Sequence, residues 1–181
     1  MRVAILTVSD AGARGERDDR SGDEIDRWIT ARKATRSARS IVPDDTIAIV
    51  RALTAWCDDD AADLVLTTGG TGLSARDVTP EATRTIIDRE APGIAERIRL
   101  LSIDSFPRAA LGRGIAGVRE RTLIVNLPGS TSGVRDALAA LAPVIEHACD
   151  ILRGRVTEHG GDGNGSGDAS GDASGSGAEA R

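Results

Sequence analysis

The sequence LVLTTGGTGLSARDVTP, residues 64–80, joins an apolar run to a glycine-rich turn and a helix start. The apolar run is short and near-continuous, which is typical of a strand buried on both faces of a parallel sheet. Glycines in the turn let the backbone approach a ligand, so that successive N–H groups can form a concave site for phosphate oxygens. Thr79 and Pro80 predict a helix with Thr79 as its N-cap and Pro80 at its first position. The stretch therefore predicts a strand, an anion-binding loop and a helix in succession.

Two further apolar runs, residues 3–8 and 123–127, have the same near-continuous character and predict two more buried strands. Residues 33–40 are mostly polar and fit an edge strand. Amphipathic segments separate these runs and predict crossover helices. The alternation predicts an α/β fold, a three-layer α/β/α sandwich with a mostly parallel central sheet, whose ligands bind at the carboxyl ends of the strands.

The helices outside this glycine-rich unit have recognisable starts and breaks. Apolar residues within 25–29 share one helical face, and a second helix should begin with Asp44 or Asp45 as its N-cap. A third apolar stripe covers residues 134–152 and contains Pro143, which should kink or split that helix because proline lacks the N–H that the helix interior needs.

The chain of 181 residues suits one folded domain, which we assign to residues 1–159. Residues 160–181 read GGDGNGSGDASGDASGSGAEAR, and these side chains offer almost no apolar area to offset chain entropy. We therefore expect a disordered tail. Its four acids and one arginine account for −3 of the net charge of −5, so the predicted domain is nearly neutral.

Composition argues against two classes of partner. A nearly neutral domain with 2% aromatic residues lacks the basic, aromatic face expected of a nucleic-acid binder. The amino terminus lacks the features of a signal peptide and no apolar run approaches membrane-spanning length, so we expect a cytoplasmic protein without a membrane partner. Cys57 and Cys149 have no CxxC spacing and are expected to be small buried hydrophobes. The basic cluster fits a solvated surface, with an anion site between subunits as the alternative: Arg32, Lys33, Arg36 and Arg39.

The glycine-rich turn differs from two familiar phosphate-binding motifs. A P-loop requires a Lys-Ser or Lys-Thr pair after its last glycine, whereas a Leu-Ser pair follows Gly72. Gly70, Gly72 and Ala75 match the GxGxxA spacing of a dinucleotide fingerprint, but the predicted helix opens only at Thr79. A nicotinamide enzyme, and a glycine-rich connection without a ligand, are the alternatives to a different kind of phosphate loop.

A second loop, residues 126–133 (NLPGSTSG), also follows a buried strand and precedes a helix, with Ser130 placed to cap that helix or to donate a hydrogen bond. Two such loops indicate two phosphorylated ligands. Asp77 closes the first loop, and Asp44, unless it is only an N-cap, should reach the same sheet edge. A carboxylate and a phosphate repel each other unless a divalent cation lies between them. Mg²⁺ prefers one or two carboxylates plus phosphate oxygens as ligands. We therefore infer a Mg²⁺–nucleotide site.

Taken together, these motifs resemble the Mog/MoaB type of molybdopterin adenylyltransferase, which is also seen as the G domain of gephyrin-like proteins. The resemblance covers about residues 3–154 and departs at Thr131, where the family often has proline, and in residues 33–40. It is carried by TVSD at 7–10, DRSG at 19–22, VPDD at 42–45, TTGGTG at 67–72, RDVTP at 76–80, EAPG at 90–93, Arg113, and LPG at 127–129.

The resemblance implies an enzyme that transfers AMP from ATP, its co-substrate, to the terminal phosphate of molybdopterin and releases pyrophosphate. Asp44 and Asp77 would be the essential acids and would hold Mg²⁺. It also implies a homotrimer or hexamer and a downstream molybdenum-insertion protein. A non-catalytic molybdopterin-binding or scaffold paralogue is the alternative. The residues expected to contact the substrates are Ser9, Asp10, Thr68, Gly69, Gly70, Thr71, Gly72, Arg76, Glu90, Pro128, Gly129 and Ser130.

Overall fold

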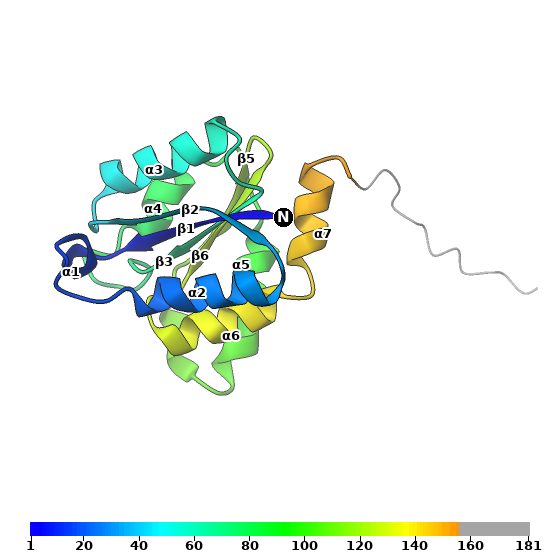
Figure 1. The fold of residues 1–181 in the computed structure, drawn as a ribbon. Helices are drawn as coiled ribbons and strands as arrows, with labels where there is room; N and C mark the ends of the chain where they lie inside the picture. Colours follow the sequence, from blue (N-terminus) through cyan, green and yellow to red (C-terminus); the bar gives the residue numbers. More distant parts are fainter. Residues whose placement is uncertain (156–181) are drawn as a thin grey trace, which may run out of the picture.

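A mixed sheet of six strands forms the centre of residues 1–155, the part of the chain that the computed structural model describes (Figure 1). The strand order is β2-β1-β3-β6-β5-β4. The first four strands in that order run parallel, whereas β5 is antiparallel to β6 and β4 is antiparallel to β5. The strands are β1 (Arg2–Val8), β2 (Thr35–Val42), β3 (Leu64–Thr68), β4 (Arg89–Glu90), β5 (Ala116–Arg119) and β6 (Thr122–Leu127).

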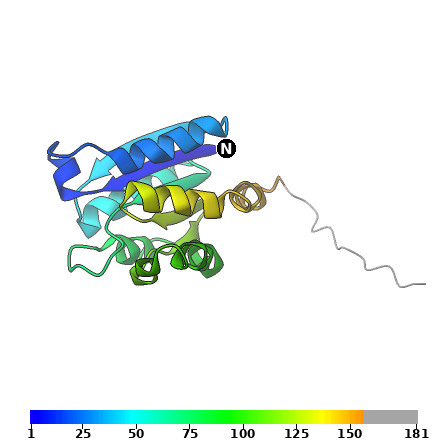
Figure 2. The same ribbon diagram turned by 90° about the horizontal axis from the view of Figure 1, so that it is seen from below.

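Helices cover both faces of the sheet, which confirms the three-layer sandwich. Helices α3 and α4 lie on one face in Figure 1, and α2, α6 and α5 lie side by side across the other face in Figure 2. The helical elements are α1 (Asp10–Ala13), α2 (Arg20–Ala31), α3 (Thr46–Asp58), α4 (Thr79–Arg84), α5 (Pro92–Ile103), the 3-10 helix η1 (Pro107–Leu111), α6 (Thr131–Leu141) and α7 (Ile145–Leu152).

Each face of the sheet has its own apolar core. Leu64 and Leu66 of β3 pack with α2, α5 and α6, whereas Val65 between them packs with α3 and α4. All three side chains are fully buried. Side chains alternate between the two faces of a strand, and both faces are covered, so the sequence shows a continuous apolar run and no apolar-polar alternation.

Two details of the helices differ from expectation. Helix α4 begins at Thr79 with Val78 as its N-cap, so Thr79 as N-cap is wrong. The Thr79 hydroxyl donates instead to the Gly69 carbonyl at 2.9 Å, which ties the helix to the glycine-rich loop. The break at Pro143 is confirmed because α6 and α7 are separate helices, but Ile151, at the end of the expected apolar stripe, is 43% exposed.

A buried ion-pair network fixes α7 to the amino ends of β1 and β3. The Asp63 carboxylate, 1% exposed, accepts a hydrogen bond from the Arg2 backbone N–H at 2.7 Å and lies 3.0 Å from Nε of Arg153. Burial alone would raise the pKa of Asp63, but Arg2 and Arg153 outweigh it and hold the pKa below its ordinary value. The predicted domain boundary at residue 159 and the predicted tail lie outside the described residues.

The remaining sequence expectations concern the edge strand, the cysteines and membrane spans. The polar edge strand is confirmed as β2, which pairs with β1 alone. Cys57 and Cys149 are free and buried, and burial raises the pKa of Cys57 to about 11 and that of Cys149 to about 12. No helix within residues 1–155 is long and apolar enough to cross a membrane.

Candidate functional site

The glycine-rich loop after β3 lies at the carboxyl edge of the sheet and requires two of its glycines. Gly69 and Gly70 have φ values of 98° and 63°, in the left-handed region, whereas the loop does not need such a φ at Gly72. A Cβ on Gly69 would lie 2.2 Å from the Val8 carbonyl oxygen, a contact that only glycine avoids. The loop therefore sits directly against the end of β1.

The second loop, after β6, touches the first. The Thr68 hydroxyl donates to the Pro128 carbonyl at 2.7 Å, and a Cβ on Gly129 would lie 3.2 Å from Cα of Gly69. Ser130 caps α6 by accepting a hydrogen bond from Gly133 N at 3.1 Å, as its position in the sequence suggested. The amino terminus of α6 thus faces the two loops, and the partial positive charge of a helix amino terminus favours phosphate.

Asp44 joins this edge through hydrogen bonds to α1. Its Oδ2 accepts the Asp10 N–H at 2.8 Å, and its own N–H donates to Asp10 Oδ1 at 3.1 Å. The N-cap of α3 is Asp45, whose carboxylate accepts from Ala48 N, so the capping role considered for Asp44 belongs to its neighbour. Asp44 is therefore available for a role in the site.

Asp10 also pairs with the first loop. The Arg76 guanidinium lies 2.8 Å from Asp10 Oδ2. Hydrogen bonding from Arg76, and then from the Asp44 N–H, holds the pKa of Asp10 below its ordinary value. Because the folded pKa is lowered, the contribution of this pair is present at neutral pH and is lost as the pH falls through that lowered pKa. The pair links α1 to the loop that ends in Asp77.

Asp77 is held by its own loop and by a distant arginine. Its Oδ2 accepts the Ser74 N–H at 2.8 Å, and a Cβ on Gly72 would lie only 3.0 Å from the same oxygen. Arg113 donates from Nε to the Gly72 carbonyl at 2.6 Å and from Nη2 to the Asp77 carbonyl at 2.5 Å, and it also pairs with Glu81. Arg113 therefore clamps both ends of the Asp77 segment.

Two adjoining pockets open at this edge of the sheet. The larger, of about 900 Å³, has a mixed polar and apolar lining and contains Asp44, whereas the smaller, of about 320 Å³, is mainly apolar and contains Asp77. Gly70, Gly129 and Ser130 line both pockets. The two loops therefore form a shared wall, with one acid on each side of it.

The structure gathers most of the predicted site residues around these pockets. Ser9, Thr68 and Gly69 line the larger pocket. The smaller pocket, but not the larger one, is lined by Thr71, Gly72, Pro128 and Asp77. Asp10 and Arg76 line neither pocket but support the loops through their ion pair.

Glu90 is the predicted residue that the structure leaves apart. It lies on β4, the edge strand farthest from β1 in the sheet order, is exposed, and accepts a hydrogen bond from Arg84 Nε at 2.9 Å. It lines neither pocket. Its contact with a substrate stays a prediction.

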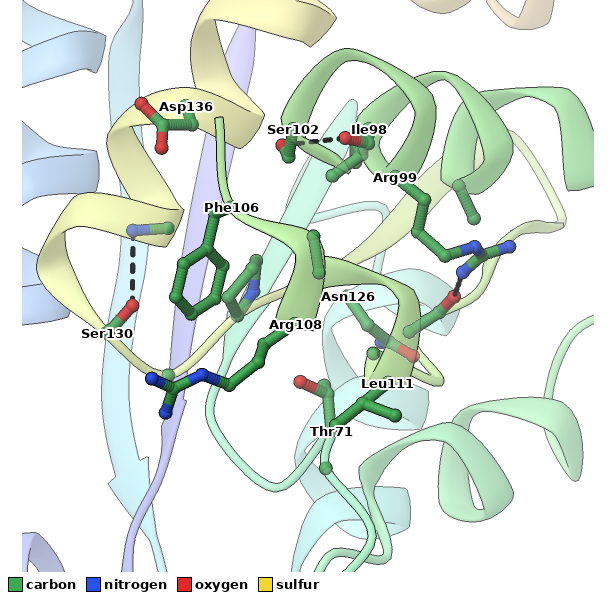
Figure 3. Close-up of a pocket in the computed structure, with 18 of the residues that line it drawn as sticks. Thr71, Ile98, Arg99, Ser102, Phe106, Arg108, Leu111, Asn126, Ser130 and Asp136 are labelled. Carbon is green, nitrogen blue, oxygen red and sulfur yellow. Dashed lines mark hydrogen bonds between the residues drawn. The ribbon is translucent and has the colours of Figure 1, made fainter. Parts of the chain in front are cut away.

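Sequence reasoning missed the outer wall of the smaller pocket, which comes from α5 and η1. Arg99, Phe106 and Arg108 line it, together with Asp136 of α6 (Figure 3). No motif marks these residues, and they lie between 22 and 59 positions after Asp77 in the sequence. The one signal for this segment in the sequence is that Phe106 is the single phenylalanine of the chain.

The donor groups fit a magnesium ion that is shared with a nucleotide. No cluster of three or more His, Cys, Asp or Glu side chains suited to a metal occurs in the described residues. Asp44 and Asp77 each have one oxygen engaged by a backbone N–H, which leaves the other oxygen without a protein hydrogen bond in the described part of the chain. Mg²⁺ bound to phosphates needs only one or two carboxylates plus water. The two acids would therefore leave most of the coordination of the ion to phosphate and water, and the magnesium site stays a prediction.

An α/β/α sandwich with two glycine-rich loops, a helix amino terminus and two adjoining pockets at the carboxyl edge defines a protein that binds phosphorylated small molecules. Residues 4–147 match the family described as "Probable molybdopterin binding domain". The chain belongs to this molybdopterin-binding family, which includes the Mog/MoaB-type proteins.

Several characterised proteins are similar over most of their length. The molybdopterin adenylyltransferase of Helicobacter pylori (strain J99) is 36% identical over 156 residues, which cover 85% of this chain and 89% of that protein. The molybdopterin biosynthesis enzyme MoaB from Thermus thermophilus is 50% identical, with a TM-score of 0.80 and coverage of 84% and 96%. The tungsten cofactor synthesizing protein MoaB from Pyrococcus furiosus is 34% identical, with a TM-score of 0.76 and coverage of 84% and 96%.

Proposed function

We propose that this chain is a molybdopterin adenylyltransferase that transfers AMP from ATP to the terminal phosphate of molybdopterin and releases pyrophosphate. The single observation that carries the proposal is the shared wall of the two pockets. Gly70, Gly129 and Ser130 line both, so phosphates of two ligands can meet at one set of backbone N–H groups and one hydroxyl. The similarity to the Helicobacter pylori adenylyltransferase over most of both chains supports it.

The reaction needs positioning and charge neutralisation more than a protein nucleophile. A phosphate oxygen of molybdopterin attacks the α-phosphorus of ATP, a new P–O bond forms, and the bond to the bridging oxygen of pyrophosphate breaks. The loop N–H groups and the amino terminus of α6 orient the phosphate oxygens. Within residues 1–155 no histidine lines either pocket, and the proposed displacement requires none.

Asp44 and Asp77 are the residues that would hold Mg²⁺. The ion would neutralise phosphate charge that would otherwise repel both carboxylates and the second ligand. Arg113 keeps Asp77 in place through the two backbone carbonyls that it binds, and Asp10 keeps Asp44 in place through paired hydrogen bonds. Both residues would therefore act through the acids, and direct contact of Asp10 with a substrate stays a prediction.

We further propose a cytoplasmic homotrimer or hexamer that delivers adenylylated molybdopterin to a downstream molybdenum-insertion protein. The family resemblance supports the assembly, as do Leu100 and Leu101 of α5, which are 68% and 58% exposed. Large exposed apolar side chains that lie next to one another are typical of a surface that contacts another chain.

The experiment that tests the activity supplies ATP, Mg²⁺ and molybdopterin and measures both pyrophosphate release and the adenylylated pterin. Wild-type protein should form the two products in equal amounts, and Asp77→Ala should abolish turnover while leaving the fold unchanged by circular dichroism. Asp59→Ala, at an exposed acid that lines neither pocket, should retain activity. Turnover by Asp77→Ala at the wild-type rate would refute the role of Asp77. Pterin binding without pyrophosphate release by the wild type would instead identify a scaffold paralogue.

A further inference from the structure

The aromatic residues of this chain are few, and one of them stands at a pocket. The sequence contains one phenylalanine, two tryptophans and no tyrosine. Trp28 and Trp56 pack against the two apolar cores, whereas Phe106 is 52% exposed and lines the smaller pocket. Among the described residues, Phe106 therefore provides the only aromatic ring that lines either pocket.

Hydrogen bonds hold the ring at this position. The Phe106 N–H donates to the Ser102 carbonyl at the end of α5 at 2.9 Å, and the Phe106 carbonyl accepts from Ala109 N at 2.8 Å. Beyond η1, the Arg113 N–H donates to the Thr71 carbonyl at 2.9 Å. The backbone that carries the ring is thus tied to α5 at one end and to the glycine-rich loop at the other.

Arg108 extends the surface that the ring offers. Its guanidinium lies 5.7 Å from the centroid of the Phe106 ring, within the range of a cation–π contact, and it also lines the pocket (Figure 3). A phenyl ring and a planar guanidinium are the two kinds of protein group on which flat heterocycles stack. The guanidinium covers part of one ring face, and the other ring face and the outer side of the guanidinium are the surfaces on which a heterocycle can stack.

The rest of the pocket suits the same kind of ligand. Ala95, Ile98 and Leu111 give it apolar walls, and its volume of about 320 Å³ is at the lower end of the range for small-molecule sites. Asp136, an exposed acid on α6, lines the pocket and offers a carboxylate acceptor for ring N–H or amino groups. An apolar slot with a carboxylate acceptor and a phosphate-binding loop at its inner wall fits a phosphorylated nitrogen heterocycle.

We propose that Phe106 and Arg108 stack on the planar nitrogen heterocycle of one of the two substrates and so determine which ring enters the smaller pocket. The inference rests on the proposed function and adds to it two ligand-binding residues outside the motifs that define the family resemblance. Adenine and pterin share the relevant chemistry, a flat ring system with N–H or amino donors at its edge. An isolated exposed apolar side chain is ordinary, but Phe106 differs because the ring lines a pocket that is also lined by the glycine-rich loop.

Calorimetric titration tests the proposal without requiring turnover. Wild type, Phe106→Ala, Phe106→Leu and Phe106→Trp are each titrated with Mg-ATP, with inorganic triphosphate plus Mg²⁺, and with molybdopterin. Loss of stacking on one aromatic ring should weaken the Kd for one ring-bearing ligand by about tenfold in the alanine variant. The Phe106→Leu variant should bind that ligand almost as weakly as the alanine variant, because leucine has no flat face. The Phe106→Trp variant should bind it with nearly wild-type affinity.

The ligands and a control variant separate the outcomes. Weaker binding of Mg-ATP with unchanged triphosphate binding assigns adenine to the pocket, and weaker binding of molybdopterin alone assigns the pterin. Ile47→Ala, at a side chain on α3 that is 68% exposed and lines neither pocket, should bind all three ligands like wild type. If Phe106→Ala binds both ring-bearing ligands within twofold of wild type, the proposal is overturned. A protein that shows these binding differences but transfers no AMP would retain the ring-stacking site and lose only the proposed function.

Discussion

Replacing Arg113 with alanine should release the segment that carries Asp77. The change removes two hydrogen bonds from a charged donor, to the carbonyls of Gly72 and Asp77, and one ion pair to Glu81. A hydrogen bond to a charged group contributes about 1.5–3 kcal/mol when buried, but the Arg113 side chain is 33% exposed, so about 1 kcal/mol for each bond is appropriate. The half-exposed ion pair adds about 0.5 kcal/mol. The expected loss is therefore about 2–3 kcal/mol.

This free energy should be visible in both stability and catalysis. For a domain of this size it corresponds to a Tm lower by about 5–10 °C in scanning calorimetry. If the same free energy keeps Asp77 in its working position, kcat/KM for pyrophosphate release should fall by roughly 30- to 150-fold. Arg113→Lys should give an intermediate value, because one ammonium group cannot bridge both carbonyls in the geometry of a guanidinium.

A matched control separates the clamp from a general loss of surface charge. Arg121→Ala removes an arginine that is 62% exposed and lies 3.7 Å from Asp60, and it should change Tm and kcat/KM little. If Arg113→Ala has kcat/KM within twofold of wild type, the reasoning is refuted, because Asp77 then keeps its position without the clamp.

Three further predictions follow from the contacts described. Arg76→Gln should move the pKa of Asp10 up toward its ordinary value in a carboxyl NMR titration, and an unchanged pKa would show that their pairing is not what lowers it. Asp63→Ala should cost about 1–3 kcal/mol in urea unfolding because the Arg2 backbone N–H loses its acceptor, while Arg153, whose side chain is 6% exposed, keeps its pair with Asp60; a loss below about 0.5 kcal/mol would contradict this. Gly69→Ala should lower both Tm and activity, since its Cβ would lie 2.2 Å from a carbonyl of β1, and normal behaviour would mean that the loop can shift freely.

Local sequence signals predicted the layers of this fold well. Continuous apolar runs identified β1, β3 and β6 because the sheet is covered on both faces, and the polar run near residue 36 identified the edge strand β2. The helix break predicted at Pro143 is confirmed, because α6 and α7 are separate helices. The start of α4 was wrong by one position because the Thr79 hydroxyl has a tertiary acceptor, the Gly69 carbonyl, that local capping rules do not include.

The site residues could be predicted from the sequence only where they lie in loops that contain a recognisable sequence motif. Gly70, Asp77 and Ser130 stand in such loops, and the strand order alone brought them together. The antiparallel strands β4 and β5, and the wall that includes Phe106, depend on how residues 89–119 fold back over the sheet edge. That path is fixed by long-range contacts, which leave no periodic pattern in the sequence.

The central proposal is that Asp44 and Asp77 would together hold one magnesium ion beside the residues that line both pockets. The direct measurement is Mg²⁺-dependent ATP binding by wild type, Asp44→Asn, Asp77→Asn and the double variant. If both acids hold the same ion, each single change should remove most of the Mg²⁺-dependent affinity and the double change should lose little more, a coupling well above about 0.5 kcal/mol. Losses that add independently, or wild-type affinity that is the same with and without Mg²⁺, would contradict the account.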